Sequence, residues 1–159
     1  MNIDIICVGT LKEKYWKDAA AEYLKRLSGF CTVSIVEVKE APLPAKARPA
    51  EEAAVILAEG KALLAQVHPR SYVIALDVRG KELSSEALAV KIKDLTVNGE
   101  SRIAFIIGGS LGLSKELLDG SDMRLSFSRM TYPHQLMRVI LLEQIYRSFK
   151  INRGETYHK

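Results

Sequence analysis

Residues 102–118 read RIAFIIGGSLGLSKELL, in which an apolar run, a glycine cluster and a short helix-forming segment follow one another directly. The apolar run, 102–107, lacks polar alternation, a pattern typical of a strand buried on both faces of a parallel sheet. Gly108, Gly109 and Gly112 come next, and Ser114 is a suitable N-cap for a helix. Strand, glycine loop and helix in this order indicate an α/β protein.

The segments on both sides repeat this alternation of strand and helix. Short apolar, β-rich runs predict further strands at 3–8, 31–38, 72–76 and 123–127. Helices are predicted at 11–27, at 50–67, from Ser84 or Ser85 to Val97, and at 134–150, with a turn at 77–80. Three prolines in 40–49 exclude a helix or a central strand there. We therefore predict an α/β fold with a mainly parallel sheet flanked by helices.

The chain has 159 residues, of which 48% are hydrophobic and 26% charged, as expected for one globular domain spanning 1–159. Its longest uncharged apolar stretch, 103–113, has 11 residues, whereas a membrane-spanning helix needs about 20. The N-terminus carries Asp4 in place of a basic region and lacks a signal-peptide cleavage site. We expect a cytoplasmic protein with no membrane partner.

Two cysteines, Cys7 and Cys31, lie in apolar runs, which predicts two buried thiols and no disulfide. Neither has the spacing of a zinc site, so we expect no metal. The net charge of +4 is unevenly distributed. Residues 1–123 hold 16 basic and 17 acidic side chains, whereas residues 124–159 hold seven and two. Such an excess suits a polyanionic partner, although a solvated helix face would look the same.

Three predicted loops follow strands at the edge where ligands bind in open α/β sheets, namely 76–80, 108–112 and 126–134. A dinucleotide site would place its glycines after the first strand, where Gly9 stands alone. The P-loop motif and the GxSxG nucleophile elbow are absent from the sequence, which excludes those two classes of site. The glycine cluster therefore indicates either a close approach to some other ligand or a tight turn alone.

Several polar residues near the C-terminus also have a purely structural interpretation. His134 follows a proline at a predicted helix start, where a capping role is favoured. Glu143 and Arg147 form an i,i+4 pair on the last helix. That helix is apolar around much of its circumference, so we infer that it packs on the core with one side and on a second subunit with the other.

Seven motifs, taken in order, resemble those of the ribosomal large subunit methyltransferase H family, which belongs to the SPOUT methyltransferases. They are Val8-Gly-Thr10, Leu76-Asp77, Ile106-Ile-Gly-Gly109 with Gly112-Leu-Ser114, Ser128-x-Met-Thr131, Pro133-His134-x-x-x-Arg138, Glu143-Gln-x-Tyr-Arg147 and Tyr157-His158-Lys159. The resemblance covers the whole chain. The tail departs from it by lacking the proline often found before the tyrosine.

This resemblance implies a C-terminal trefoil knot, a homodimer and S-adenosylmethionine bound in the knot. It also implies N3 methylation of a pseudouridine in 23S ribosomal RNA of the assembled ribosome. Carried over by position, the cofactor would contact Leu76, Gly108, Phe127, Ser128, Arg129, Met130, Thr131 and Tyr132. The knot lies outside what sequence physics alone would propose, because knotted chains are very rare.

Methylation at N3 requires loss of a weakly acidic imide proton, which calls for a base or for a cation that stabilises the anion. We hypothesise that Tyr157 and His158 reach the active site of the partner subunit, and that Arg138 and Arg147 hold the site or the RNA. Candidate phosphate contacts are Arg129, Lys150, Arg153 and Lys159. The alternatives are a non-enzymatic ribosome-associated RNA-binding protein and an enzyme acting on a free nucleotide or small metabolite.

Overall fold

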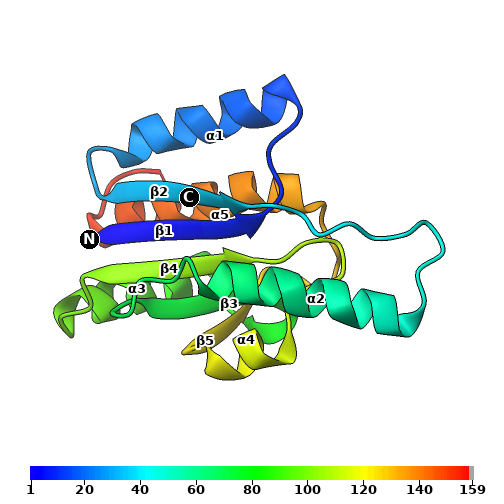
Figure 1. Ribbon diagram of the computed structural model, residues 1–159. Coiled ribbons are helices and arrows are strands. Elements are labelled where there is room, and N and C mark those ends of the chain that lie inside the picture. The colour runs from blue at the N-terminus through cyan, green and yellow to red at the C-terminus, as the bar shows by residue number, and fades with distance from the viewer. Residues whose placement is uncertain (158–159) are drawn as a thin grey trace.

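The computed structural model describes residues 1–157 and contains a single five-stranded sheet in the order β2-β1-β4-β3-β5 (Figure 1). The strands are β1 (Asn2–Val8), β2 (Thr32–Val38), β3 (Tyr72–Glu82), β4 (Arg102–Ile107) and β5 (Met123–Ser126). The helices are α1 (Lys14–Leu27), α2 (Pro49–Leu64), α3 (Ser85–Val97), α4 (Lys115–Gly120) and α5 (His134–Asn152). All four strand pairings are parallel, which confirms the predicted α/β class.

Two apolar clusters cover the two faces of the sheet. On one face, Ile3, Ile5 and Phe105 pack in a buried cluster with side chains from α1, α3 and α5. On the other face, Ile6 and Ile106 pack with residues from α2 and α4. Alternate residues of β1 and β4 therefore point into different layers, and both are apolar. This explains why these strands show no polar alternation in the sequence.

Strand β3 differs from the prediction, because it continues to Glu82 where a turn was expected at 77–80. Its pairing with β5 breaks after Leu76 and resumes at Lys81, which faces Leu125 as Leu76 does. The extra residues form an irregular bulge. Gly80 permits it, since a Cβ atom there would lie 2.7 Å from the Arg124 carbonyl carbon. The predicted turn at 77–80 is therefore wrong, because these residues form an irregularity within β3 and pairing with β5 resumes after them.

The remaining boundaries agree closely with expectation. Ser84 and Ser114 accept hydrogen bonds from Ala87 N and Leu117 N, and so cap α3 and α4 as predicted. Helix α1 begins at Lys14, three residues later than expected, and α2 ends at Leu64, three residues earlier. The proline-bearing segment 39–48 extends beyond the end of the sheet in Figure 1. Among the described residues, no helix combines the length and apolar character needed to cross a membrane.

Candidate functional site

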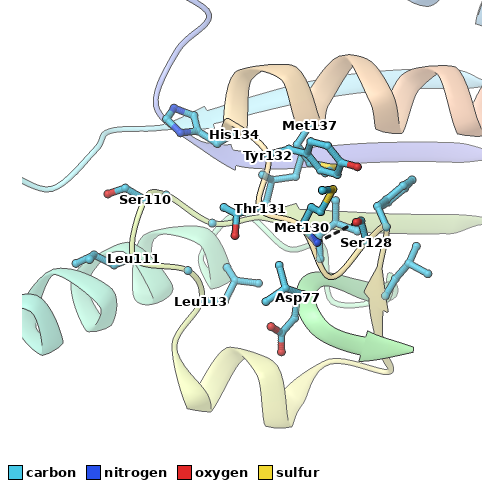
Figure 2. Close-up of a pocket in the computed structure, with 18 residues that line it drawn as sticks. Asp77, Ser110, Leu111, Leu113, Ser128, Met130, Thr131, Tyr132, His134 and Met137 are labelled. Carbon is cyan, nitrogen blue, oxygen red and sulfur yellow. Dashed lines mark hydrogen bonds between the residues drawn. The ribbon is translucent and has the colours of Figure 1, made fainter. Parts of the chain in front are cut away.

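A pocket of about 300 Å³ lies at the carboxyl ends of β4 and β5 and beside residues 76–78 of β3, where the three segments predicted to be functional meet (Figure 2). The loop after β4 forms one wall, and the segment after β5 forms the opposite wall. The lining residues are Leu76, Asp77, Val78, Ile107, Gly108, Gly109, Ser110, Leu111, Gly112, Leu113, Leu125, Phe127, Ser128, Met130, Thr131, Tyr132, His134 and Met137. Parallel pairing brings these ends together, as the sheet topology predicts.

The glycine loop has its shape because side chains are absent from it. A Cβ atom at Gly108 would lie 2.8 Å from the carbonyl carbon of Gly112, so the two ends of the loop approach each other closely. Gly112 has a φ of +83°, a conformation that L side chains rarely adopt. Its N–H donates to the Gly109 carbonyl at 3.1 Å. The glycine cluster is thus a tight turn, and its backbone also lines a pocket. Both interpretations of the sequence, a turn and a close approach to a ligand, are therefore compatible with this loop.

Hydrogen bonds of two serine hydroxyls hold the first part of the segment 127–133. The Ser126 hydroxyl lies 3.1 Å from both the Val78 and the Ser128 carbonyl oxygens, and the Ser128 hydroxyl accepts from Met130 N at 2.9 Å. Met130 itself is 71% exposed at the rim. Figure 2 shows Met130, Thr131 and Tyr132 gathered opposite Ser110 and Leu111. The pocket therefore combines a hydrogen-bonded backbone segment at Ser126–Ser128 with an exposed apolar residue, Met130, at its rim.

Arg138 lies beneath this site, with its side chain fully buried, and is not among the lining residues. It donates to Glu37 Oε1 at 2.7 Å, to the Val8 carbonyl at 2.8 Å and to the Gly9 carbonyl at 2.7 Å. These partners are the ends of β1 and β2, so Arg138 joins α5 to the edge of the sheet where the pocket opens. In this chain it reaches backbone and Glu37 instead of the pocket.

The comparisons with known proteins agree with this geometry. Residues 1–158 match the family described as "Predicted SPOUT methyltransferase". Two proteins named ribosomal RNA large subunit methyltransferase H are similar over all 159 residues, covering 100% of both chains. They come from Carboxydothermus hydrogenoformans, at 55% identity, and Clostridium novyi, at 58%. The chain belongs to the ribosomal RNA large subunit methyltransferase H family of SPOUT methyltransferases. The resemblance found in the sequence is thus confirmed.

One solved structure has a similar fold. It is described as "The structure of a probable methylase family protein from Haemophilus influenzae Rd KW20". The TM-score is 0.56 at 15% sequence identity, with 99% of this chain and 70% of that chain covered. At this identity the likeness concerns the arrangement of helices and strands alone.

Most of the cofactor residues expected for a SPOUT methyltransferase line the pocket: Leu76, Gly108, Phe127, Ser128, Met130, Thr131 and Tyr132. Arg129 does not line it, and its side chain is 92% exposed with Glu82 3.5 Å away. His134, for which the sequence favoured a capping role, is the first residue of α5, after the N-cap Pro133, and is one of the residues that line the pocket. Its ring points away from the pocket interior in Figure 2. Within residues 1–157, no group of three or more potential metal ligands is found.

Tyr157 lies away from the pocket of its own chain. Tyr157 packs on α5, with its hydroxyl 3.3 Å from Glu143 Oε1 and its ring against Tyr146 and Arg147. His158 and Lys159 lie outside the described residues. Met137, which lines the pocket, and Tyr146 are nine positions apart on α5, about 14 Å along a helix axis. The structure therefore separates Tyr157 from the cofactor residues.

The basic residues near the C-terminus are largely engaged within the chain. Lys150 pairs with Glu155 and has only 18% of its side chain exposed, which leaves it little access to phosphate. Arg153 is half exposed and lies over the Phe30 ring at 4.1 Å. Arg124 pairs with Asp119. The basic residues between 124 and 157 are therefore engaged in ion pairs, and Arg129 and Arg153 are more exposed than Lys150, the third candidate phosphate contact in that range.

Sequence reasoning missed Glu59, which touches the glycine loop from behind. It is 4% exposed, and burial raises the pKa of its carboxyl group. The hydrogen bond from Ala41 N lowers that pKa again, in part. A signal was available, because Val55, Glu59 and Leu63 follow one another at i,i+4 spacing on α2. An acidic residue between two buried apolar positions marks a carboxyl group that the fold encloses.

Proposed function

We propose that the protein transfers the methyl group of S-adenosylmethionine to N3 of a pseudouridine in 23S ribosomal RNA, within assembled cytoplasmic ribosomes. The observation that carries this proposal is the pocket formed jointly by residues 76–78 of β3 and the loops after β4 and β5. It occurs in a chain whose full-length relatives are named ribosomal RNA large subunit methyltransferases H. Their substrate class is brought to this chain by that similarity.

The pocket suits S-adenosylmethionine in size and in chemistry. Its volume of about 300 Å³ is at the lower end of the range for small-molecule sites, about 300–1,000 Å³. Leu76, Leu125 and Phe127 provide apolar surface, while the glycine loop provides backbone polar groups without side chains that would fill the space. When bound, this cofactor supplies a methyl group activated by a sulfonium with a neutral thioether as leaving group.

The chain's own residues would mainly align the reactants and exclude water. The N3 lone pair forms the new C–N bond as the S–C bond breaks, and the N3 proton must pass to an acceptor. His158, assisted by Tyr157, is proposed to orient the base and accept this proton. Arg138 contributes by fixing the ends of β1 and β2 beneath the pocket, which makes it a positioning residue.

The position of Tyr157 supports catalysis across a homodimer. Because Tyr157 packs about 14 Å along α5 from Met137, its own pocket is out of reach for a tail held in this way. On the side of α5 opposite the core, Leu136, Val139 and Ile140 are half-buried apolar residues, followed by Glu143 and Arg147. We propose that this stripe meets its counterpart in a second copy, so that each tail serves the partner's pocket.

The path of the C-terminal part supports a trefoil knot. From β5, at one end of the sheet, residues 127–133 return past the glycine loop to α5, where Gln135 Oε1 accepts from Lys12 N at 2.9 Å. The chain thus crosses from the β5 side to the end of β1 while lining the same pocket as residues 107–113. A crossing of this kind, threaded through a loop, is the knot that the SPOUT family implies.

Transfer of labelled methyl from S-adenosylmethionine to ribosomes from cells lacking this protein tests the proposal. We expect label in a methylpseudouridine of the large-subunit RNA, identified by mass spectrometry of nucleosides. Absence of label with folded protein and intact ribosomes would refute the reaction. Binding to ribosomes without binding of S-adenosylmethionine would instead favour a non-enzymatic RNA-binding protein.

Coexpression of two inactive variants tests catalysis across the dimer. His158→Ala removes the proposed proton acceptor, whereas Gly108→Val disrupts the glycine loop, because a Cβ atom there would lie 2.8 Å from the Gly112 backbone. If the tail acts in the partner, a mixed dimer contains one complete site, and we expect activity to return. If the tail acted in its own chain, every site would lack one component and the mixture would stay inactive.

A further inference from the structure

Glu59 places a buried carboxyl group directly behind the glycine loop that lines the pocket. Two backbone segments meet its two oxygen atoms. Oε1 accepts from Ala41 N, in the proline-bearing segment 39–48, at 3.0 Å. Oε2 faces Gly109 so closely that a Cβ atom there would lie 2.8 Å from it. One carboxyl group thus touches two segments that are distant in sequence, and one of them lines the pocket.

The neighbouring residue, Gly60, extends this contact to the other end of the loop. A Cβ atom at Gly60 would lie 2.8 Å from Ser114 Cβ, so α2 packs against the N-cap of α4 with no room for a side chain between them. Ser114 is itself buried. The Glu59-Gly60 pair therefore supports the glycine loop near both of its ends, Gly109 and Ser114. If the Glu59 carboxyl group moved, Gly109 would lose the side chain that it packs against.

We propose that Glu59 is a positioning residue for cofactor binding, which holds the glycine loop and the segment 39–48 in one arrangement. This inference rests on the proposed function for the identity of the ligand. Glu59 does not line the pocket, so it acts through Gly109 and Ala41 and has no direct contact with the cofactor. An ionisable group is costly in such a buried place unless it makes specific contacts.

The electrostatic surroundings agree with this role. The charged and titratable groups that act on Glu59 are Glu40, which raises its pKa, and His134, which lowers it. Both lie near Gly9, where a Cβ atom would be 3.8 Å from His134 Nε2 and 3.9 Å from Glu40 Oε2. Since His134 lines the pocket, the carboxyl group is coupled to the site by charge as well as by contact.

Calorimetric binding of S-adenosylhomocysteine to three variants tests the inference. Glu59→Ala removes both contacts, and we expect a loss of affinity of about tenfold to a hundredfold, the usual range for a lost hydrogen bond to a charged group. Glu59→Gln keeps an oxygen that can accept from Ala41 N, and should restore affinity to within about threefold. Glu116→Gln makes the same change on an exposed position of α4 and should alter nothing. In turnover, KM for S-adenosylmethionine should rise more than kcat falls.

Gly109→Ala provides an independent test from the opposite side of the contact. Its methyl group would collide with Glu59 Oε2, so we expect weaker binding. In the double variant with Glu59→Ala the collision is removed, and the combined loss should be clearly smaller than the sum of the two single losses. Additive losses, or wild-type affinity in a folded Glu59→Ala protein, would overturn the inference. If Glu59→Ala does not fold, wild-type affinity in Gly109→Ala overturns it. A wild-type protein that binds no cofactor would instead refute the proposed function.

Discussion

Replacing Arg138 by methionine is expected to destabilise the protein strongly while leaving the pocket lining unchanged. Arg138 is fully buried, and it donates to two carbonyl oxygens and to Glu37. Methionine replaces the aliphatic part of the arginine side chain and cannot donate a hydrogen bond. The substitution therefore removes the guanidinium donors while most of the apolar packing is kept.

The magnitude follows from the groups left without a partner. The Val8 and Gly9 carbonyls would each lose a donor in a buried place, at about 1–3 kcal/mol apiece. The Glu37 side chain is 35% exposed, so water can replace part of its lost contact. The expected loss is about 3–5 kcal/mol in the free energy of unfolding, the usual cost of removing one member of a buried ion pair. For a chain of this size, this corresponds to a fall in Tm of about 6–20 °C.

Urea unfolding at fixed protein concentration measures this loss directly, and concentration must be held constant because the proposed dimer would gain stability from association. Arg138→Lys retains the charge but presents its donors from a single nitrogen atom, so we expect an intermediate loss. An Arg138→Met protein within about 1 kcal/mol of wild type would show that these three contacts do not hold the strand ends. In that case the role of Arg138 would have to lie in contacts made only by the assembled enzyme.

Three further outcomes are expected. Gly112→Ala and Gly99→Ala both place a side chain at positive φ with open space around it, so each should cost about 1–2 kcal/mol in urea unfolding, but only Gly112→Ala should weaken S-adenosylhomocysteine binding. Burial raises the pKa of the Cys7 and Cys31 thiols to about 11, so at pH 8 a thiol reagent should label the native protein about 100-fold more slowly than the unfolded chain. Because burial raises the pKa of the Glu59 carboxyl group above 4.5, the unfolding free energy of wild type relative to Glu59→Gln should fall as pH rises through that raised pKa. A difference that stayed constant between pH 4 and 8 would contradict this.

The position of the site could be predicted from the sequence because it depends on local signals. Buried apolar strands followed by glycine or polar loops are visible in one dimension, and parallel pairing then requires their ends to meet at one edge. Segments 76–78, 107–113 and 125–134 meet there as expected. The same reasoning missed the continuation of β3 past Leu76 to Glu82, since the pairing of Lys81 with Leu125 depends on strands far apart in sequence.

Roles that depend on which side of a helix meets the core were harder to predict. Arg138 and Glu59 are both charged residues in helices, and a charged residue in a helix usually faces solvent. Here both are enclosed by backbone from other segments, Val8 and Gly9 in one case and Ala41 and Gly109 in the other. A helical period can indicate that Glu59 is buried, but it does not identify the backbone groups that contact it, because these come together only when the layers pack.

Helix α5 connects stability with the site in a way that bears on every variant described above. Its first residue, His134, lines the pocket, its second turn carries Arg138, and its last half binds the tail through Glu143 and Tyr146. A change that shifts this helix along its axis would therefore move the pocket wall, the strand ends and the tail together. For that reason a loss of activity alone cannot assign a role to a residue of α5. Three separate measurements distinguish these effects. Cofactor affinity reports on the pocket wall at the start of α5, unfolding on the strand ends held by Arg138, and complementation between subunits on the proposed role of the tail.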